Sequence, residues 1–258
     1  MAARPTLLVL QYDGGSFAGW QRQPAARTVQ GVVEDILARL VGRRTAVVGA
    51  GRTDAGVHAT GQAAAAIVPE QWEPRHLVRA MNALLPSDIW VASARHMVPG
   101  FNPRRDALER TYCYRIGTDA GARSPFRCRH EWSVPGPLDH GALQASASSV
   151  QGEHSFRALS AKGVERPHYR CRVFEALWLK REDAPGLEFW VTADRYLHHM
   201  VRFLVGAMVD IARGRRPKAD LVKLLGGTDN RDASPPAPAH GLFLVAVRYP
   251  THLYAAAR

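Results

Sequence analysis

The stretch GAGRTDAGVHATGQ, residues 49–62, connects two apolar runs that are typical of β-strands. The run before it, residues 45–48, is rich in β-branched residues, and the run after it covers residues 63–68. Its four glycines permit positive φ and let the backbone approach a ligand closely. Among its polar side chains are those of Arg52, Thr53, Asp54 and His58. A connection between two strands has no structural need for so many polar groups, so we interpret it as an active-site loop.

Simpler explanations of this loop have to be weighed first. Glycine-rich turns with an aspartate are common between strands, and these two features alone would favour a plain turn. A dinucleotide fingerprint would need a glycine where Asp54 stands and a helix after it, and the Gly-Lys-Ser/Thr of a Walker loop is absent. Asp54 and His58 have the spacing of a metal pair on a helix, but no helix is predicted there. What is left is a carboxylate with an arginine two residues before it.

Hydrophobic periodicity predicts the order β-α-β-β-α-β for the first part of the chain. Thr28 and Gly42 have the positions of an N-cap and a C-cap around the first helix, and Pro74 lies in the first turn of the second. The predicted strands cover residues 6–12, 45–48, 61–68 and 88–97, and the predicted helices cover residues 29–40 and 74–85.

The second part of the chain predicts the same order of elements. The predicted strands cover residues 110–116, 171–180, 187–193 and 242–249, and the predicted helices cover residues 138–150 and 196–213, with a short one after residue 217. Two βαββαβ units in series predict an α+β fold of two ferredoxin-like halves, with antiparallel sheets flanked by helices and an active-site cleft between the halves. We place the halves at residues 1–105, which carry the aspartate loop, and 106–258.

The charge of the chain favours a nucleic-acid partner. Its net charge is +11, and only four of its 34 basic residues are lysine. The isoelectric point of about 10.2 lies in the range of nucleic-acid binders. Arginine offers a planar donor fork to phosphate and stacks on bases, although a bias in codon composition would give the same arginine excess.

Cysteine usage and hydropathy indicate the compartment. The three cysteines are odd in number and form no C-x-x-C pair, which argues against a disulfide framework or a zinc site. The first residues contain too short an apolar stretch for a signal peptide. The longest apolar stretch, residues 201–212, is interrupted by Asp210 and is not predicted to span a membrane. We therefore expect a cytoplasmic protein that does not insert into a membrane.

Five segments in order resemble the tRNA pseudouridine synthase A family. They are YDGGSFAGWQRQP at residues 12–24, the loop at 49–62, RTYCYRI at 110–116, HHMVRFLVGAMVDIARG at 198–214 and AHGLFLVAVRYP at 239–250. The resemblance implies an isomerase that converts uridine to pseudouridine on the 3′ side of the anticodon stem-loop, at positions 38 to 40 of the tRNA. It also implies a homodimer. Since this isomerisation needs neither a redox step nor external energy, we expect no cofactor and no metal.

The resemblance assigns roles to three residues. Asp54 matches the catalytic aspartate, and Arg52 matches an arginine that helps to hold the flipped nucleotide. Tyr112 matches the tyrosine that stacks against the uracil. For Arg52 the alternative is a simple ion pair with Asp54 or another acid. For Tyr112 the alternative is a core position, because it alternates with Tyr114 along a strand.

Arg202 lies beside the apolar stripe of the helix predicted at residues 196–213. A buried arginine normally has an acidic partner, and we expect that partner to be Asp54. His198 and His199 are adjacent, so a helix would point them about 100° apart and they would not easily chelate one metal. Packing or RNA contact is the expectation for both.

Departures from the family pattern and two rival functions complete the prediction. Asn102, Pro103 and Phe203 stand where the family usually has other residues, which affects details of RNA contact. The first rival is a non-catalytic RNA-binding protein, for which a basic surface would suffice. The second is a metal-dependent hydrolase using Asp54, His58 and the histidine pair.

Overall fold

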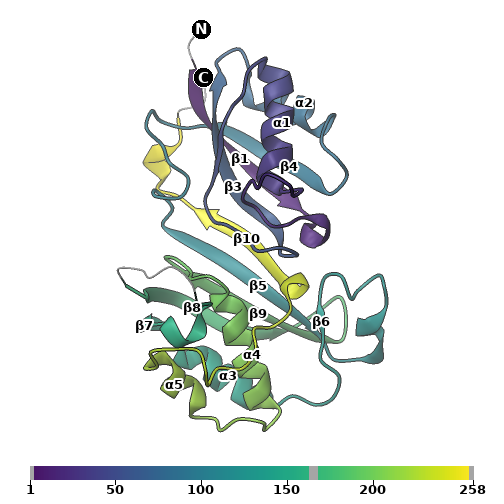
Figure 1. Ribbon diagram of the computed structural model, residues 1–258, viewed down its shortest axis with the longest axis vertical. Coiled ribbons are helices and arrows are strands. Elements are labelled where there is room, and N and C mark those ends of the chain that lie inside the picture. The colour runs from purple at the N-terminus through teal and green to yellow at the C-terminus, as the bar shows by residue number, and fades with distance from the viewer. Residues whose placement is uncertain (1–2, 163–167, 256–258) are drawn as a thin grey trace. The chain divides into compact units, whose positions relative to one another are not determined.

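The computed structural model describes residues 3–162 and 168–255, which form two compact units (Figure 1). The first unit combines Met1–Glu109 with Phe243–Arg258, and the second is Arg110–Leu242. The predicted division into residues 1–105 and 106–258 differs from this, because the last strand returns to the first unit. Strand pairing between residues so far apart in sequence leaves no local pattern, so the sequence could not reveal it.

The first unit contains one sheet and two helices in the predicted order β-α-β-β-α-β, followed by the returning strand. Its elements are β1 (Ala3–Tyr12), α1 (Val29–Val41), β2 (Val47–Gly49), β3 (His58–Pro69), α2 (Pro74–Asn82), β4 (Ile89–His96) and β10 (Leu242–Arg248). The strand order is β4-β1-β3-β10, and β2 pairs with β3. The β1, β2, β3 and β4 pairings are antiparallel, whereas β10 runs parallel to β3.

Helix α1 has the predicted caps. The Thr28 side chain accepts a hydrogen bond from the Gly31 amide, and Gly42 has a left-handed conformation with φ of 75° at the other end. Both caps satisfy backbone groups that a helix end leaves open. The helices α1 and α2 contact each other and lie on the same face of the sheet (Figure 1). The core of this unit contains Leu8, Leu10, Leu37, Leu77 and Met81, all fully buried.

The second unit contains the remaining strands and three helices. Its elements are β5 (Glu109–Gly117), β6 (Trp132–Ser133), α3 (His140–Ser149), β7 (Gly152–Ser155), β8 (Arg170–Lys180), β9 (Gly186–Ala193), α4 (Met200–Ala212) and α5 (Asp220–Leu225). The strand order is β5-β9-β8-β7 with antiparallel pairing, and β6 runs parallel to β5. The three helices contact one another, and α3 also packs on β8. Strand β7 was not predicted, because its sequence GEHS is short and polar.

Helix α4 begins four residues later than predicted. His199 has a left-handed conformation with φ of 62°, so the helix begins at Met200. The preceding Tyr196 is held outside the helix, since its hydroxyl donates to the Val191 carbonyl at 2.8 Å. The expectation that a helix points His198 and His199 apart is therefore wrong. Their ring centroids lie 3.9 Å apart.

Within residues 3–162 and 168–255, none of the helices has the length and apolar character that a membrane crossing requires.

Candidate active site

The loop between β2 and β3 is held by hydrogen bonds on both sides of Arg52. The Gly51 carbonyl accepts from Gln62 Nε2 at 2.9 Å. The Thr53 carbonyl accepts from the Trp20 amide at 3.0 Å. Because both neighbours of Arg52 are fixed in this way, the backbone that carries Arg52 and leads into Asp54 has little freedom.

Gly19 allows the close approach of the Trp20 segment to this loop. Its φ is +96°, and a Cβ at this position would lie 2.7 Å from the Thr53 carbonyl oxygen. Any other residue would therefore push the two segments apart as well as strain its own backbone. The contact between residues 19–20 and Thr53 needs a glycine.

A network of buried side chains contacts the loop at Thr53. The Tyr12 hydroxyl and Thr53 Oγ1 lie 2.8 Å apart, and Gln62 Nε2 lies 3.5 Å from the same Tyr12 oxygen. All three residues are buried, with Gln62 fully so. Burial raises the pKa of Tyr12 to about 12, which outweighs the opposing effect of its hydrogen bonds to Thr53 and Gln62. Tyr12 is therefore a neutral hydroxyl at any physiological pH.

The two charged residues of the loop differ in exposure. Asp54 is half-buried, and Arg52 is exposed. Within residues 3–162 and 168–255, Arg52 forms no ion pair, so its pairing with Asp54 or another acid is not seen. The loop thus offers a guanidinium to a ligand from solvent and holds a carboxylate two residues away.

His58 has a structural role at the start of β3. Its Nδ1 lies 3.0 Å from the Gly14 amide and 3.2 Å from Asp13 Oδ1. A backbone amide can only donate, so we assign Nδ1 as its acceptor, which leaves the ring proton on Nε2. The imidazole is 2% exposed and stacks on Phe243 of β10 at 4.8 Å. An Nδ1 that accepts from the backbone is not available as a metal ligand.

Tyr112 lies in β5 of the second unit, as predicted. Its ring is 7% exposed and meets the Tyr196 ring edge-on, with centroids 4.8 Å apart. Tyr114, two residues on, is fully buried, and its hydroxyl donates to the Pro238 carbonyl at 2.8 Å. Burial raises the pKa of Tyr114 well above its usual value. Of the two tyrosines, Tyr114 is the core residue, and Tyr112 keeps a slightly exposed ring.

Arg202 lies on α4 and is fixed by a backbone segment that follows α5. Its Nε donates to the Ala237 carbonyl at 2.7 Å, and the Ala237 amide donates to the Arg202 carbonyl at 2.9 Å. The structure thus explains how Arg202 is oriented within its own unit. Its predicted pairing with Asp54 joins residues of two different units and stays a prediction.

The sequence missed the residues that support the loop. Tyr12 and Gln62 lie within two of the segments that resemble the family, but nothing in their spacing indicates that they meet. Ala237 was not singled out at all, because it acts through its backbone.

Comparison with known proteins gives consistent matches over nearly the whole chain. The family model described as tRNA pseudouridine synthase matches residues 8–98 and 147–250. A protein named tRNA pseudouridine synthase A from Myxococcus xanthus is 37% identical over 242 residues, which cover 94% of this chain and 91% of that protein.

Two further proteins with the same name match the same share of this chain. The one from Solidesulfovibrio magneticus is 41% identical over 246 residues, covering 94% of this chain and 90% of its own. The one from Moorella thermoacetica is 39% identical over 251 residues, covering 94% of this chain and 98% of its own. A family model that matches most of the chain, and relatives at this identity and coverage, establish the family. The chain belongs to the tRNA pseudouridine synthase family.

Proposed function

We propose that this protein is an isomerase that converts uridine to pseudouridine in tRNA, at the 3′ side of the anticodon stem-loop. The observation that carries the proposal is the loop at residues 49–62, where a half-buried carboxylate is held on a rigid backbone beside an exposed arginine. Relatives named tRNA pseudouridine synthase A, aligned over more than nine-tenths of the chain, support the choice of reaction and substrate.

The proposed reaction breaks the N1–C1′ bond of uridine and joins C5 of the turned uracil to C1′. The proton on C5 leaves to water, and N1 gains one, so the product is an isomer of the substrate. C1′ becomes electron-poor when N1 leaves, and the Asp54 carboxylate can stabilise or attack it, as carboxylates do in glycoside hydrolysis. Removal of a sugar proton by the same carboxylate is the alternative, and both need an ionised Asp54.

The other site residues bind the extruded nucleotide in this proposal. The target base must leave its stack before a carboxylate can reach C1′. The exposed guanidinium of Arg52 is suited to a phosphate beside the flipped nucleotide, and the ring of Tyr112 to the face of the uracil. Arg202, oriented by Ala237, is proposed to pair with Asp54 and to orient its carboxylate. None of these steps needs a cofactor or a metal.

Two rival functions lose support from the geometry of the loop. A metal-dependent hydrolase would use His58, but its Nδ1 accepts from the Gly14 amide and its ring packs on Phe243. A non-catalytic RNA-binding protein has no use for a carboxylate next to its phosphate-binding arginine, because a carboxylate repels phosphate. The isomerase accounts for both residues.

We also propose that both units are ferredoxin-like. In the first unit, the antiparallel order β4-β1-β3-β2 with two helices on one face supports this. In the second, β5-β9-β8 repeats the β1-β3-β2 part of that order. The predicted cleft between the units stays a prediction.

The proposal includes a homodimer in the cytoplasm. Ten base pairs of duplex extend over about 34 Å, whereas half of this chain has a radius of gyration of about 14 Å. A two-fold partner would extend the basic surface along the same tRNA, and a C2 interface is the commonest way to provide it. All three cysteines are free thiols, in keeping with a reducing compartment.

The experiment that tests the reaction uses tRNA transcripts with tritium at C5 of uracil. Formation of the C5–C1′ bond expels this hydrogen, so the wild-type protein should release tritium into water. The Asp54→Asn variant keeps the shape of the side chain without its charge and should release none while still binding tRNA. Absence of release by metal-free and metal-supplemented wild type, with several tRNAs, would refute the proposal.

A further inference from the structure

The connection that follows β5 presents an aromatic ring to solvent. Phe126, in the segment RSPFRCRH at residues 123–130, is 92% exposed. Among the residues that the structure describes, the next most exposed large hydrophobic side chain is Val222, at 58%. Most phenylalanines pack at least one face of the ring, so this degree of exposure needs an explanation.

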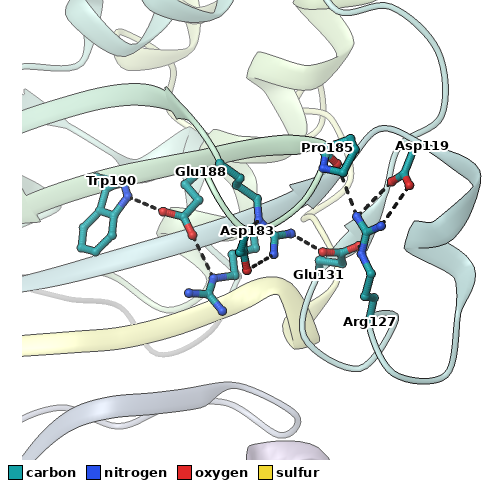
Figure 2. A network of polar contacts seen from close by, with 9 residues as sticks. Asp119, Arg127, Glu131, Asp183, Pro185, Glu188 and Trp190 are labelled. Carbon is teal, nitrogen blue, oxygen red and sulfur yellow. Dashed lines mark hydrogen bonds and ion pairs between the residues drawn. The ribbon is translucent and has the colours of Figure 1, made fainter.

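Arg127, the residue after Phe126, contacts both ends of this connection. Arg127 Nη1 donates to Asp119 at 3.0 Å, at the start of the connection, and Arg127 Nε lies 2.8 Å from Glu131, at its end. Its Nη2 also donates to the Pro185 carbonyl at 3.3 Å, in the turn between β8 and β9 (Figure 2). The hydrogen bond to Asp119 is the main reason that the pKa of Arg127 is raised. Arg127 therefore has a scaffolding role, with its charge already neutralised.

A second arginine fixes the far end of the connection. Glu131 is 2% exposed and also pairs with Arg181, whose side chain is 5% exposed. Arg181 in turn contacts Asp183 at 2.8 Å, in the same turn (Figure 2). Ion pairs this deeply buried hold one geometry, because separating them would leave a charge without a partner. Phe126 therefore lies at the tip of a loop that these ion pairs hold in one conformation.

The tip of this loop is basic. Residues 120–130 contain three arginines and no acidic residue. Arg123 and Arg129 are both exposed and lie three positions to either side of Phe126. Within residues 3–162 and 168–255, Arg123 forms no ion pair. An exposed guanidinium beside an exposed aromatic ring matches a nucleotide, which offers a phosphate and a π-face.

We propose that Phe126 is a stacking platform for an unpaired base of the RNA substrate, with Arg123 as a contact to the neighbouring phosphate. This rests on the proposed function in taking that RNA to be tRNA. A protein partner fits less well, because a stable interface buries about 800 Å² per partner around an apolar centre. No other large hydrophobic residue is exposed in the described chain between positions 109 and 173.

Three variants test the stacking role by measuring the Kd for an unmodified tRNA transcript. Phe126→Ala should raise Kd by about 5- to 150-fold, since stacking on an aromatic side chain is worth about 1–3 kcal/mol per base. Phe126→Leu should lose nearly as much, because it keeps apolar bulk without a π-face. Phe126→Trp should bind at least as tightly as wild type. The matched control is Phe174→Ala on β8, which removes a 46% exposed ring and should change Kd less than twofold.

A fully paired RNA duplex provides the second arm. Its bases are not available for stacking, so the wild type and Phe126→Ala should bind it equally. The melting temperature should be the same for all variants, because the substituted side chain makes few contacts. An unchanged Kd for tRNA in Phe126→Ala, or an equal loss on tRNA and duplex, would overturn the proposal. If Phe126→Ala sedimented with a different mass from the wild type, the proposal would be overturned, and Phe126 would belong to a protein interface.

The tritium-release assay separates this inference from the proposed function. If the wild type releases label and Phe126→Ala binds tRNA normally, only the stacking role fails. If the wild type releases no label but binds tRNA through Phe126, the isomerase fails and the stacking role stands.

Discussion

Replacing Tyr12 with phenylalanine removes one hydroxyl from the network that supports the aspartate loop. That hydroxyl lies 2.8 Å from Thr53 Oγ1, and both residues are buried, at 4% and 6% exposure. A neutral hydrogen bond contributes about 1 kcal/mol, and a buried hydroxyl left without a partner costs about 1–3 kcal/mol. The free energy of unfolding should therefore fall by about 1–3 kcal/mol, as measured by urea denaturation.

The same change should affect turnover more than binding. Thr53 directly precedes Asp54, so a loosened Thr53 lets the carboxylate move relative to C1′ while the exposed Arg52 can still reach phosphate. A misplacement of about 1 Å costs on the order of 100-fold in rate. In the tritium-release assay, kcat should fall by up to about 100-fold with little change in KM.

A double-mutant cycle with Thr53→Val isolates the hydrogen bond. Removing both hydroxyls leaves neither of them without its partner, so the double variant should be more stable than the sum of the two single losses predicts. The coupling should be about 1 kcal/mol or more. Coupling below about 0.3 kcal/mol, or a normal kcat in Tyr12→Phe, would refute the reasoning that this pair positions the loop.

The pH dependence gives a further check on the same residue. The pKa of Tyr12 is about 12 in the folded protein, above its ordinary value of 10.0, so the folded state favours the neutral phenol. The contribution of the neutral Tyr12 phenol to the free energy of unfolding is complete below pH 10 and is lost as the pH rises to 12. The reason is that Tyr12 ionises at a lower pH in the unfolded chain than in the folded protein. Tyr12→Phe should reduce this decline, although Tyr114 and Tyr196 contribute to it as well.

Three more changes test other parts of the molecule. Tyr112→Ala should abolish tritium release if the ring stacks on uracil, whereas Tyr112→Phe should be mild unless the hydroxyl moves a proton; near-normal release by Tyr112→Ala would exclude both roles. Glu131→Ala should lower the free energy of unfolding by about 3–5 kcal/mol, because Arg181 and Arg127 lose a buried partner, and thermal denaturation would measure it. Raising the salt concentration should weaken tRNA binding with a log–log slope of about −0.7 to −0.9 per phosphate contact, and a flat response would mean that the +11 charge is not used on tRNA.

Local signals predicted the elements that local interactions determine. Helix α1 begins and ends where Thr28 and Gly42 indicated, because capping depends on a few neighbouring residues. The start of α4 was missed for the opposite reason. Residues 196–199 have a helical pattern, yet the Tyr196 hydroxyl is bound to β9 and His199 has a positive φ. Tertiary contacts overrode the local preference there.

Long-range pairing explains the other differences. The sequence marks residues 242–249 as a strand, but not that Phe243 pairs with His58, which is far away in the chain. The candidate site divides in the same way. Arg52 and Asp54 stand together in one glycine-rich loop and could be proposed from the sequence, whereas the support from Tyr12 and Gln62 required the sheet.

The sheet explains how a loop can hold a carboxylate so firmly. Tyr12 and Gln62 belong to β1 and β3, which pair along most of their length. The register of this pair shifts between Leu10 and Tyr12, where β3 has one residue more than β1. The ladder on either side of this shift holds Tyr12 and Gln62 in place, and the Tyr12 hydroxyl lies within hydrogen-bond distance of both Gln62 Nε2 and Thr53 Oγ1. The aspartate loop has no regular structure of its own, yet its position is as well determined as the strands beneath it.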